Sequence, residues 1–237
     1  MTDLSSRQHD AFNNPAKAQC RDANLRVLRE AAHLLWEDDS RSRLRCDWCE
    51  LMGETGLLTL NLLEREGVLA PAGFVGVDLD PERIDAFRRA RPDLKWIAGN
   101  LYEHLHAPEM AAVGVLNLDE YGDVGNRSAE ADFPLIQGLV RRGLETFGEF
   151  ALFWNQDLDS VSRRGQKRGE ALRRHADMVA AVLQSCLPRR DLTSSMLLPP
   201  GSEVDIDAGE VGVFGAFEIY RGKKGGHRMA NLRVILR

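Results

Sequence analysis

Residues 44–56 read LRCDWCELMGETG, and they are followed by an apolar segment and then by FVGVDLDP at residues 74–81. This stretch has the order of a strand, a glycine-containing turn, a helix and a second strand that ends in an acidic residue. Gly56 and Asp78 are about 20 positions apart, the spacing at which an acidic side chain meets a ribose in nucleotide-binding folds. The stretch therefore predicts the first half of a nucleotide-binding α/β sheet.

The glycines and acidic residues of this stretch have a direct chemical use. Gly53 and Gly56 allow a ligand to approach the backbone and expose amide groups at the start of a helix. Glu50 ends the first strand at the expected switch point of the sheet, where ligands bind in open α/β folds. The carboxylate of Asp78 can accept two hydrogen bonds from a cis-diol. These positions predict a nucleotide-containing ligand.

The rest of the chain alternates between strand-like apolar runs and amphipathic helices. Strands are predicted at 44–51, 74–77, 94–97, 111–118 and 149–154, and helices at 16–36, 57–66, from about 133, and at 169–187. Asp80 is expected to cap a helix whose first residue is Pro81. Two further runs, at 211–220 and 229–236, flank RGKKGG, which is typical of a hairpin.

Two segments resemble motifs of the class I S-adenosylmethionine-dependent methyltransferases. Residues 78–91, DLDPERIDAFRRAR, resemble the second motif, whose acidic residue, here Asp78, holds the cofactor ribose. Residues 95–101, KWIAGNL, resemble the third motif, in which a polar residue and its neighbour frame the adenine. The first motif is similar in part, since Met52 and Glu54 occupy two glycine positions while Gly56 keeps the last.

The resemblance covers roughly residues 44–237 and implies a fold and a cofactor. The implied fold is a seven-stranded, mostly parallel Rossmann-like α/β sheet with helices on both faces and a C-terminal antiparallel hairpin. Residues 1–43 would form an N-terminal arm and a helix that covers the sheet edge or, as the alternative, floors or lids the substrate site. The implied cofactor is S-adenosylmethionine, and its expected contacts are Glu50, Gly53, Gly56, Asp78, Leu79, Asn100 and Leu101.

The segment NLDEYG at 117–122 follows the fourth predicted strand, where the family places catalytic residues. Amino-group methyltransferases often carry Asn/Asp-Pro-Pro-Tyr/Phe there, but this segment has no proline and Tyr121 comes four residues after Asn117 rather than three. Asn117, Asp119 and Tyr121 are the catalytic candidates. Asp119, or alternatively Glu120, could act as general base for an oxygen or nitrogen nucleophile. A polar transition from strand to loop is the alternative interpretation.

A basic segment follows the fifth predicted strand. Its cations are Arg163, Arg164, Lys167, Arg168, Arg173 and Arg174, against the single acid Glu170. Phosphate contacts through Arg163, Arg164, Lys167 and Arg168 would suit a nucleic acid. No aromatic residue is interleaved for base stacking, and a solvated charged face is the alternative.

Composition limits the remaining classes of protein. The chain has 237 residues, of which 43% are hydrophobic and 28% charged, and its net charge of −5 argues against a generally basic nucleic-acid surface. No apolar run reaches the roughly 18 residues of a membrane span, and the N-terminus lacks a signal peptide, so a cytoplasmic protein is expected. Cys46 and Cys49 have redox or zinc spacing, but positions three apart on a strand face opposite sides and there is no second pair, which favours structural cysteines and no metal.

The sequence thus predicts a transferase that moves the methyl group of S-adenosylmethionine to an acceptor, with a nucleic acid favoured over a small molecule. Two alternatives stay open. The altered first motif is typical of a methyltransferase-like binding module without activity. An NAD(P)-dependent oxidoreductase would need Gly-x-Gly-x-x-Gly after the first strand, and this pattern is absent.

Overall fold

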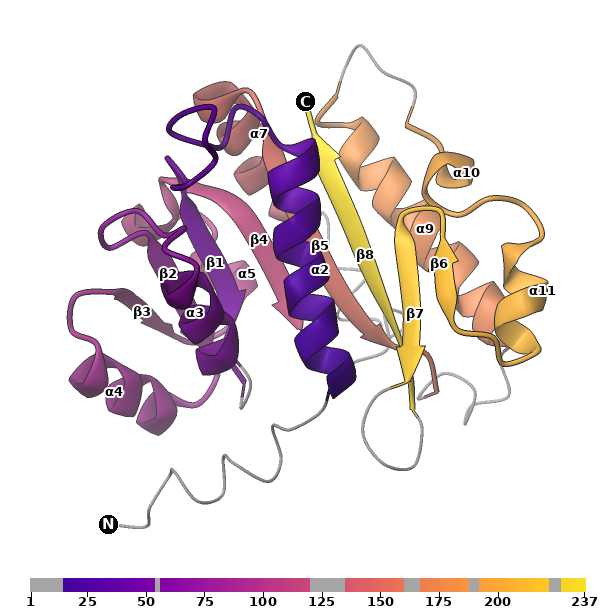
Figure 1. The fold of residues 1–237 in the computed structure, drawn as a ribbon, viewed down its shortest axis with the longest axis horizontal. Helices are drawn as coiled ribbons and strands as arrows, with labels where there is room; N and C mark the ends of the chain where they lie inside the picture. Colours follow the sequence, from indigo (N-terminus) through magenta and orange to yellow (C-terminus); the bar gives the residue numbers. More distant parts are fainter. Residues whose placement is uncertain (1–14, 54–55, 120–134, 160–166, 188–191, 222–226) are drawn as a thin grey trace.

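The computed structural model describes residues 15–53, 56–119, 135–159, 167–187, 192–221 and 227–237. They form one mixed sheet of eight strands in the order β3-β2-β1-β4-β5-β8-β7-β6, with helices on both faces (Figure 1). The predicted α/β class is confirmed, whereas the predicted count of seven strands is wrong. No helix in these ranges is long and apolar enough to cross a membrane.

The parallel half of the sheet contains the switch point. It comprises β1 (Asp47–Leu51), β2 (Phe74–Asp78), β3 (Lys95–Ala98), β4 (Val113–Asp119) and β5 (Phe150–Asp157). From β1 the chain adds β2 and β3 on one side, and then returns to add β4 and β5 on the other. The carboxyl ends of β1 and β4 therefore flank the position where ligands bind in open α/β sheets.

The antiparallel half ends the sheet. β8 (Arg228–Leu236) pairs with β5 and with β7 (Phe217–Arg221), which confirms the predicted hairpin. The run predicted as one strand at 211–220 is divided into β6 (Gly212–Phe214) and β7 by a tight turn. Gly215 has a φ of 62°, and a Cβ there would lie 2.3 Å from the carbonyl oxygen of Leu197. Only glycine fits this turn, and the turn produces the eighth strand.

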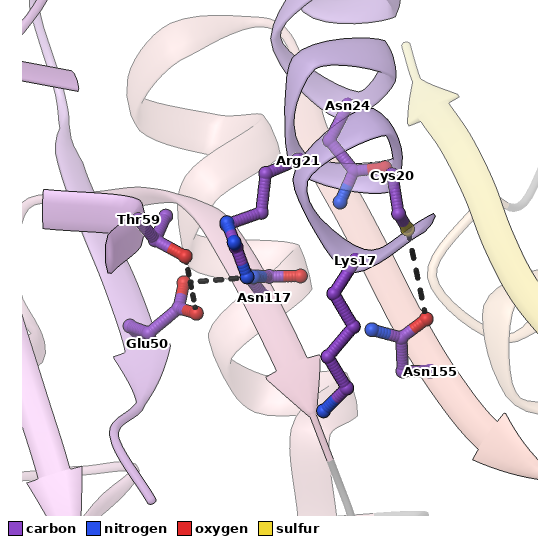
Figure 2. Close-up of a pocket in the computed structure, with 8 residues that line it drawn as sticks. All are labelled: Lys17, Cys20, Arg21, Asn24, Glu50, Thr59, Asn117 and Asn155. Carbon is purple, nitrogen blue, oxygen red and sulfur yellow. Dashed lines mark hydrogen bonds between the residues drawn. The ribbon is translucent and has the colours of Figure 1, made fainter. Parts of the chain in front are cut away.

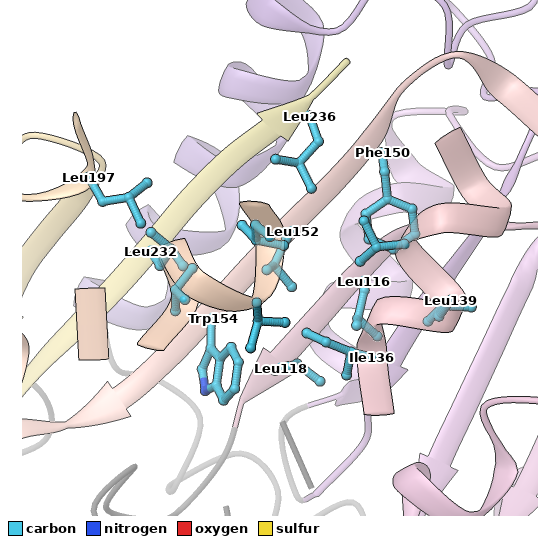
Figure 3. Packing of buried hydrophobic residues seen from close by; sticks show 14 of the residues in the cluster. Leu116, Leu118, Ile136, Leu139, Phe150, Leu152, Trp154, Leu197, Leu232 and Leu236 are labelled. Carbon is cyan, nitrogen blue, oxygen red and sulfur yellow. The ribbon is translucent and has the colours of Figure 1, made fainter. Parts of the chain in front are cut away.

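Two apolar clusters cover the two faces of the sheet. On one face pack α2 (Pro15–Ala31), α3 (Gly56–Arg65) and α4 (Pro81–Ala90). On the other pack α5 (Leu101–His104), the 3₁₀ turn η1 (Pro108–Met110), α7 (Ile136–Phe147), α9 (Arg168–Gln184), α10 (Ser194–Leu197) and α11 (Ser202–Asp207). Figure 3 shows this second cluster, with Leu116 of β4 beside Ile136 and Leu139 of α7, and with Leu232 of β8 on the side of Leu197 of α10.

The cysteines near β1 belong to different clusters. Cys46 packs in the cluster under α2 and α3, and Cys49 packs in the cluster under α7 and α9. This arrangement confirms that the two thiols face opposite sides of the sheet. Both are free, and burial raises the pKa of Cys46 to about 12 and also raises that of Cys49. Such thiols are not activated for redox or metal chemistry.

The helix predicted at 16–36 ends earlier, at Ala31. The carboxylate of Glu149, at the start of β5, accepts hydrogen bonds from the backbone amides of His33 and Leu34, both at 2.7 Å. These amides bond to a carboxylate instead of continuing the helix. Glu149 also pairs with Arg237 at 2.7 Å, so that the end of α2 is tied to both β5 and the C-terminus.

One histidine lies inside the cluster under α9. The ring of His175 packs edge-on against Trp154 with centroids 5.0 Å apart, and against Phe217 at 5.8 Å. Neither ring nitrogen has a hydrogen-bond partner. Burial lowers the pKa of His175 to about 3, because the charged imidazolium would have neither water nor a counter-ion there.

Candidate functional site

The candidate site lies where β1 and β4 meet beneath the N-terminal half of α2. Glu50 of β1 and Asn117 of β4 are partners in the strand register, so their side chains project from the same face of the sheet. Both are nearly inaccessible to solvent, with 2% of Glu50 and 4% of Asn117 exposed. Figure 2 shows the two side chains facing each other under α2.

Side chains from β1, α3 and β4 donate hydrogen bonds to the buried carboxylate of Glu50. Its Oε2 accepts from Trp48 Nε1 at 2.8 Å and from Asn117 Nδ2 at 2.7 Å, and its Oε1 accepts from Thr59 Oγ1 at 3.0 Å. A buried carboxylate is tolerated only when it is hydrogen-bonded in this way. Glu50 is therefore fixed between β1, α3 and β4, and its carboxylate orients Asn117.

The amide of Asn117 has only one consistent orientation. A carboxylate can only accept hydrogen bonds, so the NH₂ group of Asn117 must face Glu50 and the amide oxygen must face away. That oxygen, Oδ1, is buried and has no hydrogen-bond partner. A buried acceptor without a hydrogen bond costs about 1–3 kcal/mol of folding stability. The Asn117 side chain lines a pocket under α2.

A narrow pocket separates α2 from this face of the sheet. Its walls come from α2 on one side and from α3, β1, β4 and β5 on the other, and they comprise Lys17, Cys20, Arg21, Asn24, Glu50, Thr59, Asn117 and Asn155 (Figure 2). Its volume of about 10 Å³ is close to what one water molecule needs. The lining is polar, and it contains two cations, Lys17 and Arg21, and one carboxylate, Glu50.

Sequence reasoning missed the polar network that seats α2 on the sheet. Asn24 Oδ1 accepts from Asn231 Nδ2 at 2.8 Å and from Arg233 Nε at 2.7 Å, both on β8. Nearby, Asn155 Oδ1 of β5 accepts from the hydroxyl of Tyr220 at 3.2 Å. The sequence does show polar residues, such as Asn155 and Asn231, within otherwise apolar strands. It does not show that the partner of Asn231 is Asn24, more than 200 positions away.

Asp78 lies at the carboxyl end of β2, as predicted, but its carboxylate is engaged within the protein. Oδ1 accepts from the backbone amide of Asp80 at 2.9 Å, and Oδ2 accepts from Arg83 at 2.7 Å. Only 7% of Asp78 is exposed. Asp80 caps α4, because its Oδ1 accepts from the amides of Glu82 and Arg83 with Pro81 in the first helical position. The predicted cap is confirmed.

The backbone near the end of β1 is open. Gly53 has a φ of 41°, and a Cβ at that position would meet nothing within 4 Å. Gly56 begins α3. Leu79, which follows Asp78, has 75% of its surface exposed. At the carboxyl ends of β1 and β2, Gly53 thus has a backbone without close described neighbours, and Leu79 presents an apolar side chain to solvent.

The two residues predicted to frame an adenine have local structural roles. Asn100 caps α5, since its Oδ1 accepts from the amide of Tyr102 at 3.1 Å. The side chain of Leu101 is buried in the cluster under α7 and α9. Contacts of these residues with a cofactor stay a prediction, and they would involve the solvent side of Asn100 and the backbone of Leu101.

The other two catalytic candidates are only partly described. Asp119 is the last residue of β4, and it pairs through its backbone with Asn155 of β5. Tyr121 lies outside the described residues, as does Glu120. The structure therefore brings Asn117 together with Glu50, and it leaves the expected roles of Asp119 and Tyr121 as predictions.

The basic segment is in part committed to internal contacts. Arg163 and Arg164 lie outside the described residues, and Lys167 precedes α9. Arg168 pairs with Asp159 at 2.5 Å, and Arg173 pairs with Glu203 at 2.9 Å. Burial raises the pKa of Asp159, but the bonds from Arg168 and from the backbone amide of Arg228 bring it below its usual range. Arg168 and Arg173 thus have carboxylate partners within the protein.

The sequence matches no protein-family model and no curated protein. The function is therefore inferred from the geometry and chemistry of the site.

Proposed function

We propose that the protein binds S-adenosylmethionine at the carboxyl ends of β1 and β2 and transfers its methyl group to an acceptor placed beside Asn117. The observation that carries the proposal is the position of Asp78 at the end of β2, next to the open backbone of Gly53 and to the switch point between β1 and β4. A carboxylate at this position is suited to a ribose diol.

The residues present are compatible with this cofactor. The carboxylate of Asp78 accepts one hydrogen bond on each oxygen, from the amide of Asp80 and from Arg83, whereas a carboxylate has about four acceptor positions. A ribose diol can use the remaining capacity without displacing Arg83. The exposed side chain of Leu79 offers an apolar surface for an adenine ring. Glu50, which is bonded to Trp48, Thr59 and Asn117, acts through Asn117 in this proposal.

S-adenosylmethionine, when bound, supplies a methyl group on a positively charged sulfur. The chain has to hold and orient the acceptor, since in-line displacement depends mainly on positioning and on exclusion of water. Asn117 Oδ1 is the group aimed at the acceptor, because it is buried and lacks a donor. It would accept a hydrogen bond from an O–H or N–H group, which turns the lone pair of that atom away from Asn117.

A methyltransferase-like binding module without activity is the second candidate. Met52, which stands at a glycine position of the first motif, is fully buried in the cluster under α2 and α3. Its side chain closes space next to Gly76, where an added Cβ would lie 3.0 Å from it. A methionine in place of this glycine would favour a narrower cofactor site, and thus a protein that binds its ligand without transferring a methyl group.

Thermal unfolding with ligands tests the proposal. S-adenosylmethionine and its demethylated product should raise the melting temperature, and NAD and NADP should not. A ligand that binds only the folded state at about a hundredfold excess over its Kd stabilises it by roughly 2.7 kcal/mol. An increase without any methyl transfer to small-molecule and nucleic-acid acceptors would support the binding module. No increase at millimolar S-adenosylmethionine would refute both the methyltransferase and a module that binds this cofactor. An increase with NAD would support an oxidoreductase.

A further inference from the structure

The interface between α2 and the sheet contains two buried amide oxygens without a donor. They are Asn117 Oδ1 on β4 and Asn231 Oδ1 on β8, and neither has a hydrogen-bond partner among the described residues. Only 4% of Asn117 and 0% of Asn231 is exposed. Both side chains lie under α2, since Asn117 lines the pocket there and Asn231 donates a hydrogen bond to Asn24 of that helix.

The neighbours of these two amides fix their orientation. Arg233 can only donate, so its Nε bond of 2.7 Å to Asn24 identifies the Asn24 atom as the amide oxygen. The same oxygen accepts from Asn231 at 2.8 Å, so Asn231 must present its NH₂ group to α2, which leaves its own oxygen unpaired. The carboxylate of Glu50 fixes Asn117 in the same way. Both acceptors cost folding free energy in the closed interface, and donors on a bound molecule would recover it.

The charges of this interface favour an uncharged ligand. Lys17 is engaged in an interaction within the protein, and the opposite charges of Arg21 and Glu50, which line the same pocket, cancel. The interface also holds four amide side chains, those of Asn24, Asn117, Asn155 and Asn231. Uncharged O–H and N–H groups match such a lining, whereas an added charge would be buried without a counter-ion.

The two halves of α2 are held on the sheet in different ways. The N-terminal half is held by polar contacts of Cys20 and Asn24 with β5 and β8, and by a small apolar cluster around Cys20. The C-terminal half is anchored by Leu25 and Leu28 in the large apolar cluster under α2 and α3, and the carboxylate of Glu149 fixes the chain just beyond it. Polar contacts can be exchanged for contacts with water at little net cost, whereas buried apolar surface cannot. The N-terminal half is therefore the part of α2 that separates from the sheet most readily.

The enclosed space under α2 is too small for an acceptor while the helix is closed. The pocket measures about 10 Å³, close to what one water molecule needs, and α2 covers Asn117 (Figure 2). We propose that the acceptor site lies between the N-terminal half of α2 and strands β4, β5 and β8, that this half of α2 lifts as a lid, and that the site takes an uncharged small molecule with O–H or N–H donors. This molecule is the methyl acceptor on the strength of the proposed methyl transfer, on which the inference rests. A nucleic acid, with its charged phosphates, does not match the site.

Thiol labelling tests the lid in the protein alone. The side chain of Cys20 is buried between α2 and the sheet, and Cys46 and Cys49 are buried in the two large clusters. Lifting of the N-terminal half of α2 exposes Cys20, whereas Cys46 and Cys49 need wider unfolding. With iodoacetamide we expect Cys20 to react at least about 10-fold faster than the other two, at a rate that depends little on urea below the unfolding transition. Equal rates for the three thiols would overturn the inference.

A disulfide lock tests the site under the lid. The side chains of Cys20 and Asn231 are in contact, so Asn231→Cys places a second thiol beside Cys20. Oxidation then ties α2 to β8, and dithiothreitol releases it. Asn231→Ser is the matched control, because it loses the same hydrogen bonds but cannot be cross-linked. Binding of formamide and of ethylene glycol is followed by the side-chain amide NMR signal of Asn117.

Formamide and ethylene glycol should both shift the Asn117 signal in the parent, in Asn231→Ser and in reduced Asn231→Cys. In oxidised Asn231→Cys we expect binding at least about 10-fold weaker, with recovery on reduction. Dimethylformamide and the dimethyl ether of the glycol lack donors, acetate carries a charge, and all three should leave the signal unchanged. No shift in the parent, equal shifts with the lock open and closed, or an equal response to acetate would overturn the inference.

Cofactor binding to the locked protein separates this inference from the proposed function. S-adenosylmethionine should bind oxidised and reduced Asn231→Cys with affinities within about twofold, because its proposed site lies at β1 and β2, away from the lock. If S-adenosylmethionine does not bind but formamide binds only with the lock open, the methyl transfer is refuted, and the lid and its site are retained for another reaction. If S-adenosylmethionine binds and formamide binds equally with the lock open and closed, the methyl transfer stands and the lid is refuted.

Discussion

The carboxylate of Glu50 holds the amide group of Asn117 at 2.7 Å, on neighbouring strands and in the same register. Because the carboxylate accepts a hydrogen bond from the NH₂ group, the amide oxygen of Asn117 is directed toward the pocket under α2. Glu50 was expected from its motif position to touch a cofactor, but its carboxylate is bonded to Trp48, Thr59 and Asn117. In the proposed site, Glu50 positions the group that meets the acceptor.

Glu50→Gln is predicted to destabilise the protein and to misorient Asn117. The substitution keeps the shape of the side chain but replaces one acceptor oxygen with an NH₂ group, while Trp48, Thr59 and Asn117 all present donors. At least one buried donor loses its partner, at a cost of about 1–3 kcal/mol. Urea denaturation measures the loss, and transfer activity should fall in protein that remains folded. Unchanged stability would contradict the hydrogen-bond arrangement.

Asp80→Ala is predicted to lower stability by about 1 kcal/mol through the loss of the cap on α4. It should have little direct effect on cofactor affinity. Thermal and urea unfolding measure the stability, and Asp80→Asn is the matched control, because asparagine is also a good cap and should restore most of it. Equal stability of the parent and Asp80→Ala would show that the cap is not needed.

The pH dependence of stability should report His175. Above pH 6.5 the histidine is neutral in both states, whereas below it only the unfolded chain takes up the proton, since burial lowers the folded pKa to about 3. The unfolded state then binds more protons, so stability falls as the pH drops from about 6.5 toward 3. At pH 5 the loss from this group is about 2 kcal/mol relative to neutral pH.

Urea denaturation of the parent and of His175→Phe at pH 7.5 and pH 5.0 measures this contribution. The difference between the two proteins isolates it from the carboxylates that also titrate in that range. His175→Phe should lose less stability than the parent between the two pH values. The same loss in both proteins would mean that His175 is not buried in its neutral form.

The sequence was sufficient for features that depend on local chemistry. Asp80 followed by Pro81 predicted a cap that the structure contains, and the glycine-rich segment at 221–226 predicted the hairpin of β7 and β8. Cys46 and Cys49 were placed correctly on opposite sides of the sheet. In each case the determining residues lie within a few positions of one another, where backbone geometry decides the outcome.

Features that depend on distant partners were not predictable from one sequence. The early end of α2 depends on Glu149, more than 100 positions away, and the turn at Gly215 is forced by the carbonyl of Leu197. Asp78 was expected to hold a ribose, but its bond to Arg83 and its near-complete burial could not be read from the sequence even though Arg83 is close in the chain. Its substitution should therefore cost stability as well as affinity.

The most direct test of the central claim is a calorimetric titration of S-adenosylmethionine into the parent, Asp78→Ala and Asp80→Ala, at a temperature where all three are folded. We expect measurable binding to the parent and to Asp80→Ala. We expect an affinity about 10- to 1000-fold weaker for Asp78→Ala, because the variant lacks charged hydrogen bonds worth roughly 1.5–3 kcal/mol each. Equal affinity of Asp78→Ala and the parent would contradict the placement of the cofactor at the end of β2.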